Sequence, residues 1–250
     1  MKKSSKTLLT MLSAAVIVAV TAFGTIAYFN DTDSDVNTFT VGRVNLELDE
    51  ADVDENGVIE NDGKRVKGNE YHLIPGQTYV KDPTVTVKAN SADAYVRMLV
   101  YVERIDQLKK ALPQFDSKGQ AIEANQKYYN DELFLIQMLC NGWDSDTWKY
   151  EDYEEVTVAG KTTGIYEFRY VANEKDTEGN TLESEVVVAN SEATKLPALF
   201  ESITVPGEID NEHLAFLNDV QIVVKAHAIQ ADGFDSAALA WNSAADLFKN

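Results

Sequence analysis

Apolar and polar residues alternate over short stretches along most of this chain, which is typical of half-buried β-strands. The alternation in residues 39–48 shifts its phase across Gly42, as a β-bulge at a glycine would cause. Residues 83–90 alternate with threonine and lysine on one side, so we expect a half-exposed strand. Residues 94–103 are apolar on both faces, and residues 220–231 form a second strongly apolar segment. These two patterns predict strands near the centre of a sheet.

Four segments break the alternation and favour helices. Residues 104–112 end before Pro113, which stops a helix. Residues 130–139 start with a cap-like asparagine and an acidic first turn, and residues 211–219 predict another short helix. In the tail, Asp235 is the expected N-cap. The apolar positions of the tail helix share one face, so the helix should dock on the body of the protein: Ala238, Trp241, Ala245 and Phe248.

Short strands with turn signals at intervals of roughly ten residues predict a mainly β fold. The expected architecture is a jelly-roll-like β-sandwich with a few short decorating helices. We expect residues 1–27 to be a signal peptide, residues 28–42 to be an N-terminal arm, and residues 43–250 to form a single β-sandwich domain.

The N-terminus has the three parts of an export signal. Three lysines lie among the first six residues, and residues 8–23 are almost entirely apolar or small. Small residues then precede a cleavage point between Ala27 and Tyr28. The alternative is a retained signal anchor, because residues 7–27 are just long enough to span a bilayer. In both cases the rest of the chain lies outside the cytoplasm.

Composition narrows the range of partners. The formal net charge of −19 at pH 7 disfavours nucleic acid and anionic lipid, and no contact with the membrane is expected after cleavage. Cys140 is the single cysteine in the sequence, so an intrachain disulfide cannot form. Its apolar surroundings in the sequence predict a buried, unreactive thiol.

A zinc peptidase is one class of exported protein that the sequence should reveal by its histidines. The chain has His72, His213 and His227. A helical zinc site needs two histidines four positions apart with a glutamate between them. Glu212 and His213 are followed by Leu-Ala-Phe, so the second histidine is missing. From these residues the sequence predicts that the chain is not an enzyme.

One acidic loop resembles a calcium-binding loop. Asp52, Asp54 and Asn56 occupy positions 1, 3 and 5 of such a loop, and Gly57 occupies position 6. Gly63 stands where the loop requires a bidentate glutamate. The two interpretations are a weak calcium site and a plain Asn-Gly hairpin, and no other cofactor is predicted.

The stretch after the cleavage point combines polar residues with spaced apolar ones: Tyr28, Phe29, Val36, Phe39 and Val41. It is too polar to nucleate a core, yet its apolar residues are suited to filling pockets as an extended strand. Such an arm can pair with the sheet edge of a neighbouring copy, and head-to-tail donation would produce an open fibre. The alternative is an N-terminal strand that folds onto its own domain.

The N-terminal motif resembles the start of the TasA/camelysin family of Gram-positive proteins, which has a G-T-x-A cleavage region, an F-x-D start and a T-F-x-x-G-x-x-x-L segment. Residues 73–100 are similar to the family's next segment, with its Pro-Gly turn. Residues 196–234 are similar to the C-terminal half of clostridial members. The positions that match the N-terminal motif are Gly24, Thr25, Ala27, Phe29, Asp31, Thr38, Phe39, Gly42 and Leu46.

This resemblance implies a secreted jelly-roll protein that polymerises into fibres of a biofilm matrix or cell surface. It implies cleavage by a SipW-type signal peptidase, a homopolymer of the chain, and accessory fibre subunits as further candidate partners. Residues 28–39 would then be the donated strand. The arm is more acidic than the family pattern, with Asp31, Asp33 and Asp35, so cations or a lower pH are candidate triggers of assembly.

Two functions of other classes stay open at this point. One is a secreted zinc-dependent protease, because some family members have been described as metalloproteases. The other is a monomeric surface adhesin whose ligand face would be an aromatic cluster: Trp143, Trp148, Tyr150 and Tyr153.

Overall fold

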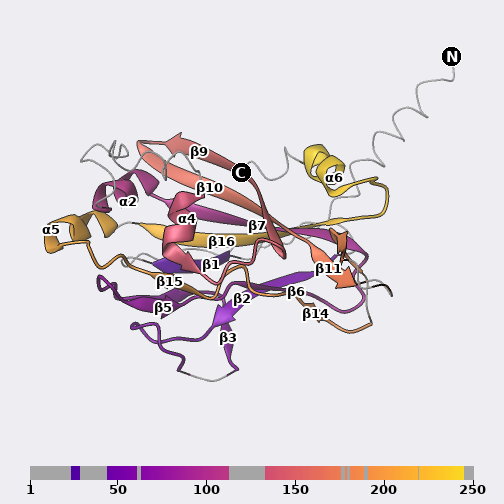
Figure 1. Cartoon of the computed structure of the whole chain (residues 1–250), viewed down its shortest axis with the longest axis horizontal. Coiled ribbons are helices and arrows are strands. Elements are labelled where there is room, and N and C mark those ends of the chain that lie inside the picture. Colours follow the sequence, from indigo (N-terminus) through magenta and orange to yellow (C-terminus); the bar gives the residue numbers. More distant parts are fainter. Residues whose placement is uncertain are drawn as a thin grey trace, which may run out of the picture.

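The computed structural model describes residues 24–28, 44–60, 63–112, 133–175, 178, 181–188, 191–218 and 220–244. Within these residues the protein is built mainly from β-strands, with a few short helices at the margins (Figure 1). The prediction of a mainly β fold with decorating helices is therefore confirmed. Among the described residues, no helix has the length and apolar character needed to cross a membrane.

The largest sheet has the strand order β4-β1-β16-β7-β10-β9, and β13 also pairs with β7. Its neighbouring strands are antiparallel, except for β1 and β4, which are parallel. The bounds are β1 (Gly24–Tyr28), β4 (Asn69–Glu70), β7 (Ala94–Glu103), β9 (Trp148–Val158), β10 (Lys161–Tyr170), β13 (Val186–Val187) and β16 (Gln221–Gln230).

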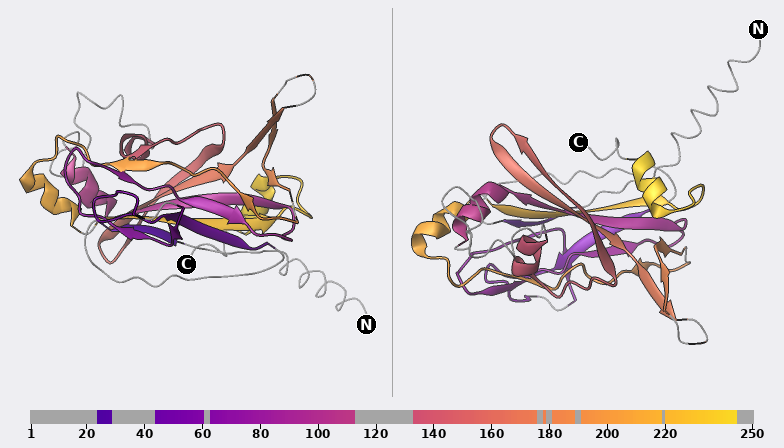
Figure 2. Two further views of the ribbon diagram at one scale, coloured as in Figure 1. Left: turned by 90° about the horizontal axis from the view of Figure 1, so that it is seen from below. Right: turned by 45° about the horizontal axis from the view of Figure 1, so that its top comes forward.

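Two smaller sheets and one hairpin complete the strands. The first small sheet has the order β14-β6-β2-β3, the second has the order β5-β15-β8, and β11 pairs with β12 in a hairpin that projects from the body (Figure 2). The bounds are β2 (Leu46–Ala51), β3 (Arg65–Val66), β5 (Thr78–Val80), β6 (Thr84–Val87), β8 (Cys140–Asn141), β11 (Ala172–Lys175), β12 (Thr181–Ser184), β14 (Thr194–Lys195) and β15 (Ser202–Thr204).

The main core joins the large sheet to the two small ones. Leu48 of β2 and Val85 of β6 belong to the same buried cluster as Val100 of β7 and Val224 of β16. The burial of both faces of β7 confirms the prediction of a central strand. Cys140 is also buried in this core, and burial raises the pKa of its thiol to about 12, so the prediction of an unreactive cysteine agrees with its surroundings.

Helices lie at the margins of the sheets: α2 (Ile105–Ala111), α4 (Phe134–Leu139), α5 (Asn211–Leu214), η2 (Ala215–Leu217) and α6 (Ala237–Ser243). Helix α2 ends before Pro113, as predicted. The expected N-cap of α6 at Asp235 is wrong. Ser236 is the N-cap, and its hydroxyl accepts a hydrogen bond from the backbone N–H of Leu239 at 3.3 Å. A serine oxygen caps a helix as well as a carboxylate does, so sequence alone did not separate the two neighbours.

Candidate functional site

Strand β1 lies between two strands that come from distant parts of the chain. On one side it pairs with β16, where Gly24 lies opposite Lys225 and Tyr28 lies opposite Gln221. On the other side it pairs with β4, where Ala27 lies opposite Asn69. We call the space bounded by 221–225 and 69–70 the β1 slot. It is one strand wide, and both of its walls offer backbone hydrogen-bonding groups.

The predicted cleavage point lies inside β1. Cleavage between Ala27 and Tyr28 would separate Gly24–Ala27, four of the five residues of the strand, from the rest of the chain. The backbone N–H and C=O groups along that edge of β16 would lose their partners. An uncovered sheet edge is a template for pairing with another strand. The position of β1 thus links the cleavage point to a pairing site.

Strand β16 forms one wall of the slot, and its side chains are mainly apolar in the paired segment. Ile222 and Val224 are buried in the main core and hold the strand in place. Lys225 is the cationic residue of the paired segment, and its ammonium group lies 4.4 Å from the centroid of the Tyr101 ring. Partial burial lowers the pKa of Lys225, and the charge of Glu103 opposes that shift. The strand therefore presents an apolar surface with one positive charge.

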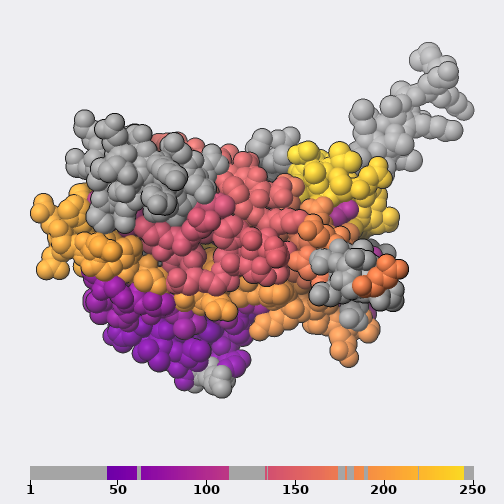
Figure 3. Space-filling model, viewed as in Figure 1, coloured from indigo at the N-terminus to yellow at the C-terminus, as the bar shows by residue number. Residues whose placement is uncertain are grey.

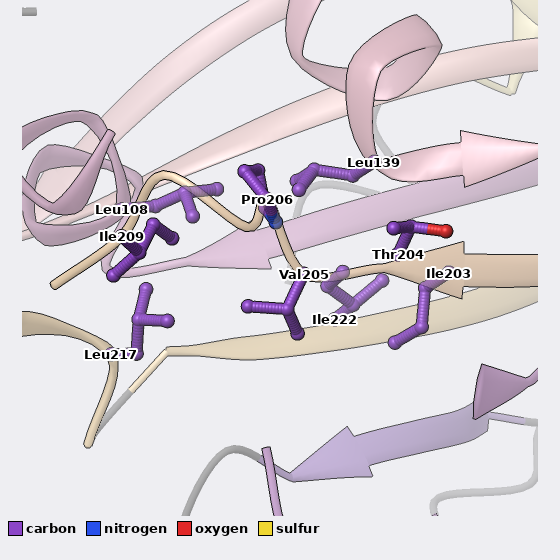
Figure 4. A pocket seen from close by; sticks show the side chains of 9 residues that line it. All are labelled: Leu108, Leu139, Ile203, Thr204, Val205, Pro206, Ile209, Leu217 and Ile222. Carbon is purple, nitrogen blue, oxygen red and sulfur yellow. The ribbon is translucent and has the colours of Figure 1, made fainter. Parts of the chain in front are cut away.

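An apolar hollow adjoins the end of β16 that is nearest to the cleavage point (Figure 4). Ile222, which pairs with Ala27, contributes to its lining. The other lining side chains come from α2, α4, η2, β15 and the loop that follows β15. They are Leu108, Leu139, Ile203, Thr204, Val205, Pro206, Ile209 and Leu217. The hollow has room for about one water molecule, so it is a small packing gap between these side chains.

The predicted assembly residues are placed only in part. Ala27 and Tyr28 lie in β1. Phe29, Val36, Phe39 and Val41 lie outside the described residues, so their role in donation stays a prediction.

The three residues predicted to bind calcium take part in a turn. The Asp54 carboxylate accepts hydrogen bonds at 2.9 Å from the backbone N–H groups of Asn56 and Val58, and these bonds lower its pKa. The Asp52 carboxylate pairs with the Lys64 ammonium group at 2.6 Å. Gly57 has a positive φ of 73°, as a tight turn requires. Calcium binding at Asp52, Asp54 and Asn56 stays a prediction.

The three histidines lie on different elements. His72 is exposed in the loop before β5. His213 lies in α5, and its ring is 2.8 Å from the carboxylate of Asp210, the N-cap of that helix. His227 is buried in β16, where its Nδ1 atom accepts a hydrogen bond from Arg97 at 3.4 Å. Among the described residues, no three histidine, cysteine or carboxylate side chains are grouped in a way that could hold a metal ion. The described residues do not fit a zinc centre of three protein ligands.

The aromatic cluster that would serve an adhesin is largely part of the core. Trp148 is fully buried, and its indole N–H donates to the Pro197 carbonyl at 3.1 Å. The Trp143 and Phe168 rings meet edge to face with their centroids 5.5 Å apart. Tyr150 and Tyr153 are also partly buried against this cluster. Trp148 is therefore unavailable to a ligand, whereas Trp143, Tyr150 and Tyr153 stay partly exposed, and the adhesin interpretation stays a prediction.

Neither wall of the β1 slot is evident from the sequence. The apolar pattern of residues 220–231 predicts the strand, but it does not show that its outer edge accepts the residues before the cleavage point. Asn69 and Glu70 lie in a polar segment that predicts only loops. The pairing of β1 with β16 joins residues nearly 200 positions apart, and no local signal reports it.

Comparison with protein families gave a match over part of this chain. The camelysin metallo-endopeptidase family matches residues 2–62, about a quarter of the chain. The resemblance to the TasA/camelysin family is confirmed over those residues. No curated protein and no solved structure matches the chain.

The family description corrects one prediction. The sequence motifs predict that the chain is not an enzyme, and the match to a family described as a metallo-endopeptidase contradicts that prediction. The prediction depended on the absence of known catalytic motifs, the zinc motif among them, and such motifs cover only some catalytic arrangements.

Proposed function

From the relationship of residues 2–62 to the camelysin family, we propose that this chain is an exported protein that assembles into extracellular fibres of a Gram-positive cell surface or biofilm matrix. Assembly proceeds by strand donation. The arm that starts at Tyr28 leaves its own subunit and fills the β1 slot of the next copy.

The observation that carries this proposal is the position of β1 between β16 and β4. In the uncleaved chain, residues 24–28 occupy the slot and pair with both of its walls, β16 and β4. Removal of residues 1–27 by a SipW-type signal peptidase empties the slot and creates a new N-terminus at the same time. A single cleavage therefore produces both the acceptor and the donor.

Main-chain hydrogen bonds to the slot walls provide affinity that does not depend on the donor sequence. Specificity comes from side chains, which project alternately to the two faces of a strand. One apolar residue of the arm, with Phe29, Val36 and Phe39 as the candidates, makes the main side-chain contact. This contact fixes the register of the donated strand.

The geometry of donation explains a fibre rather than a closed oligomer. The donor is the N-terminal arm and the acceptor is a sheet edge, so the two surfaces in each contact are different. Such a heterologous contact generates an open chain unless its rotation closes a ring. Copies of this chain are the primary partners, and accessory subunits with a compatible arm can join the same fibre.

Charge sets the conditions for assembly. Cleaved copies lack the three lysines of residues 1–27, so their formal net charge is −22 instead of −19 and they repel one another; the arm adds Asp31, Asp33 and Asp35 to each contact. Calcium or mild acidity should therefore accelerate assembly by reducing the repulsion.

Negative-stain microscopy of three purified forms tests the proposal. Residues 28–250 carry a free arm and an empty slot and should form fibres. Residues 24–250 differ only by the Gly-Thr-Ile-Ala segment of β1 and should stay monomeric, because the slot is filled within the subunit. Residues 41–250 lack residues 28–40 of the arm and should also stay monomeric, with folding checked by circular dichroism. Fibres from residues 41–250 would contradict the proposal.

The family description favours a second candidate function, a metallo-endopeptidase. The described residues do not supply a zinc centre, so this function would depend on ligands that include residues outside them. The test is the cleavage of an unfolded protein substrate by the purified chain, combined with measurement of bound zinc. Activity that is abolished by a chelator and restored by zinc would establish it, and cleavage that is insensitive to the chelator would exclude it.

A further inference from the structure

A lysine, a glutamate and an asparagine form a cluster in the interior of the protein. Lys81 and Glu50 have no solvent exposure, and Asn69 is 7% exposed. The Lys81 ammonium nitrogen lies 2.6 Å from Glu50 Oε2, and the Asn69 side-chain amide donates to Glu50 Oε1 at 2.8 Å. One carboxylate thus holds the amine of a lysine and the amide of an asparagine. We call these three residues the Lys–Glu–Asn cluster.

Contacts of neighbouring residues hold together the segments that carry Glu50 and Lys81. The backbone N–H of Ala51, next to Glu50, donates to the Asp82 carboxylate at 2.7 Å, so the residues around Lys81 are tied to β2. Arg65 reinforces the tie, because its guanidinium group contacts both the Asp49 and the Asp82 carboxylates. The segment that contains the cluster forms the purple block at the lower side of the space-filling view (Figure 3).

We propose that Lys81 and Asn69 are joined by an isopeptide bond that forms within the folded protein, with Glu50 as the group that transfers protons. The proposal is independent of fibre assembly. It requires only a nucleophile, an electrophilic carboxamide and a shared proton carrier, and the cluster supplies all three.

The bond forms in balanced steps. Glu50 accepts one proton from the Lys81 ammonium group, which leaves a neutral amine. The amine nitrogen attacks the side-chain carbonyl carbon of Asn69, and the electron pair of the C=O bond moves to the oxygen. Collapse of this intermediate breaks the bond between that carbon and the asparagine nitrogen. The leaving nitrogen takes one proton from Glu50 and departs as ammonia, while the former lysine nitrogen returns one proton to Glu50. No oxidant or other reactant is needed.

The surroundings of Asn69 are suited to these steps. The backbone N–H of Val53 donates to Asn69 Oδ1 at 3.1 Å, so it is placed to stabilise the negative charge that develops on this oxygen. The Asn69 nitrogen also donates to the Ala51 carbonyl at 2.8 Å, which holds the leaving nitrogen beside Glu50. The proton acceptor, the proton donor and the oxyanion donor are therefore all present around one amide.

The dry environment favours the reaction. Two charges lose their hydration when they are buried, and their mutual attraction offsets this cost poorly. The reaction removes the cost, because it replaces the charged pair by a neutral amide and a neutral carboxylic acid. Tyr71 lies beside the cluster, and burial together with the charge of Glu50 raises the pKa of its hydroxyl, as expected for a site without water. The departure of ammonia makes the bond permanent in practice.

The bond would close a loop from Asn69 to Lys81 and tie β4 covalently to the end of β5. A cross-link of this kind stabilises a protein by restricting its unfolded state. An exported chain is exposed to unfolding and proteolysis. With a single cysteine, this chain cannot form an intrachain disulfide that would stabilise it.

Peptide mapping of the purified, unfolded wild-type chain tests the proposal directly. Trypsin cuts after Lys67 and Lys88 but cannot cut after an amidated Lys81. The expected product is peptide 68–88, lighter than its sequence mass by one ammonia, about 17 Da. Peptide 68–81 at its full mass would overturn the proposal. Peptide 68–81 lighter by one ammonia would also overturn it, because it would show cyclisation of the asparagine without a bond to Lys81.

Glu50→Gln tests the proton carrier, since an amide cannot accept the lysine proton. The variant should yield peptide 68–81 at full mass. Its matched control is Glu47→Gln in the same strand: Glu47 is half-buried and pairs with Lys67 and Lys88, and its substitution should leave the bond intact. Retention of the bond in Glu50→Gln would overturn the role of Glu50. The wild-type map decides the existence of the bond even if the variant does not fold.

Discussion

The Lys81 ammonium nitrogen lies 2.6 Å from the Glu50 carboxylate, and neither side chain reaches solvent. Removal of one partner leaves the other buried without compensation. Lys81→Met leaves Glu50 as an isolated buried carboxylate and also removes the amine of the proposed cross-link, so we expect it to lower the free energy of unfolding by at least about 3–5 kcal/mol, measured by urea denaturation. The double variant Lys81→Met/Glu50→Leu should recover part of this loss, because it removes the isolated charge as well.

The control for this prediction is Lys88→Met. Lys88 pairs with Glu47 at the surface and its side chain is 45% exposed, so its removal should change the free energy of unfolding by less than about 1 kcal/mol. Equal losses in Lys81→Met and Lys88→Met would contradict the account of the buried pair.

His227 should make stability depend on pH. Burial, together with the charges of Arg97 and Lys225, lowers its pKa well below the ordinary value, so the folded protein keeps the ring neutral. Below pH 6.5 the unfolded chain binds a proton that the folded protein does not bind, and stability falls as the pH decreases. Between about pH 7.5 and about pH 5.5, this single group should cost about 1.4 kcal/mol.

The variant His227→Gln should lose this contribution, and chemical denaturation at the two pH values measures the difference. His213→Gln is the matched control, because His213 is exposed and pairs with Asp210. A wild type and a His227→Gln variant with the same pH dependence would show that His227 becomes protonated in the folded state.

Gly164 permits the close contact between β10 and α2. A Cβ atom at this position would lie 2.4 Å from Cδ1 of Ile105 and 3.2 Å from the Tyr153 ring. We expect Gly164→Ala to lower the free energy of unfolding by about 1–3 kcal/mol. Ile105→Val removes the clashing methyl group and should rescue part of the loss in the double variant.

Gly207→Ala is the control for this clash. A Cβ atom there would meet Gly76 Cα at 3.5 Å, which is an ordinary contact, so the effect should be small. If the two glycine variants are equally stable, α2 moves to accommodate the new methyl group.

Phe39 should matter for assembly more than for folding. Phe39→Asp in residues 28–250 should slow fibre growth, followed by light scattering, while the free energy of unfolding of the monomer changes little. Thr40→Asp adds the same charge on the opposite face of an extended strand and should have the smaller effect on growth. Equal loss of stability and assembly in Phe39→Asp would identify Phe39 as an ordinary core residue.

Much of the fold could be predicted from local patterns. The two-sided apolar segment at 94–103 matches β7, and the pattern at 220–231 contains β16. Pro113 marks the end of α2 because proline cannot continue a helix. These features succeed because burial of a strand or termination of a helix is encoded by residues that are close in sequence.

The candidate sites could not be predicted in the same way. Glu50 and Lys81 are 31 positions apart, and each looks like a solvated charge in its own segment. Their burial depends on how β2 packs against the end of β5. The β1 slot likewise depends on long-range pairing, and a segment identified by its composition as a cleavage region gives no sign of being a strand.

The central claim is that the arm binds another subunit in the slot emptied by cleavage. A synthetic peptide of residues 28–41, added to residues 41–250, tests it most directly by isothermal titration calorimetry. The account predicts one peptide bound per subunit, inhibition of fibre growth when the peptide is added to residues 28–250, and weaker binding when the peptide carries Phe39→Asp. A folded 41–250 form that binds no peptide, together with fibre growth unaffected by it, would contradict strand donation.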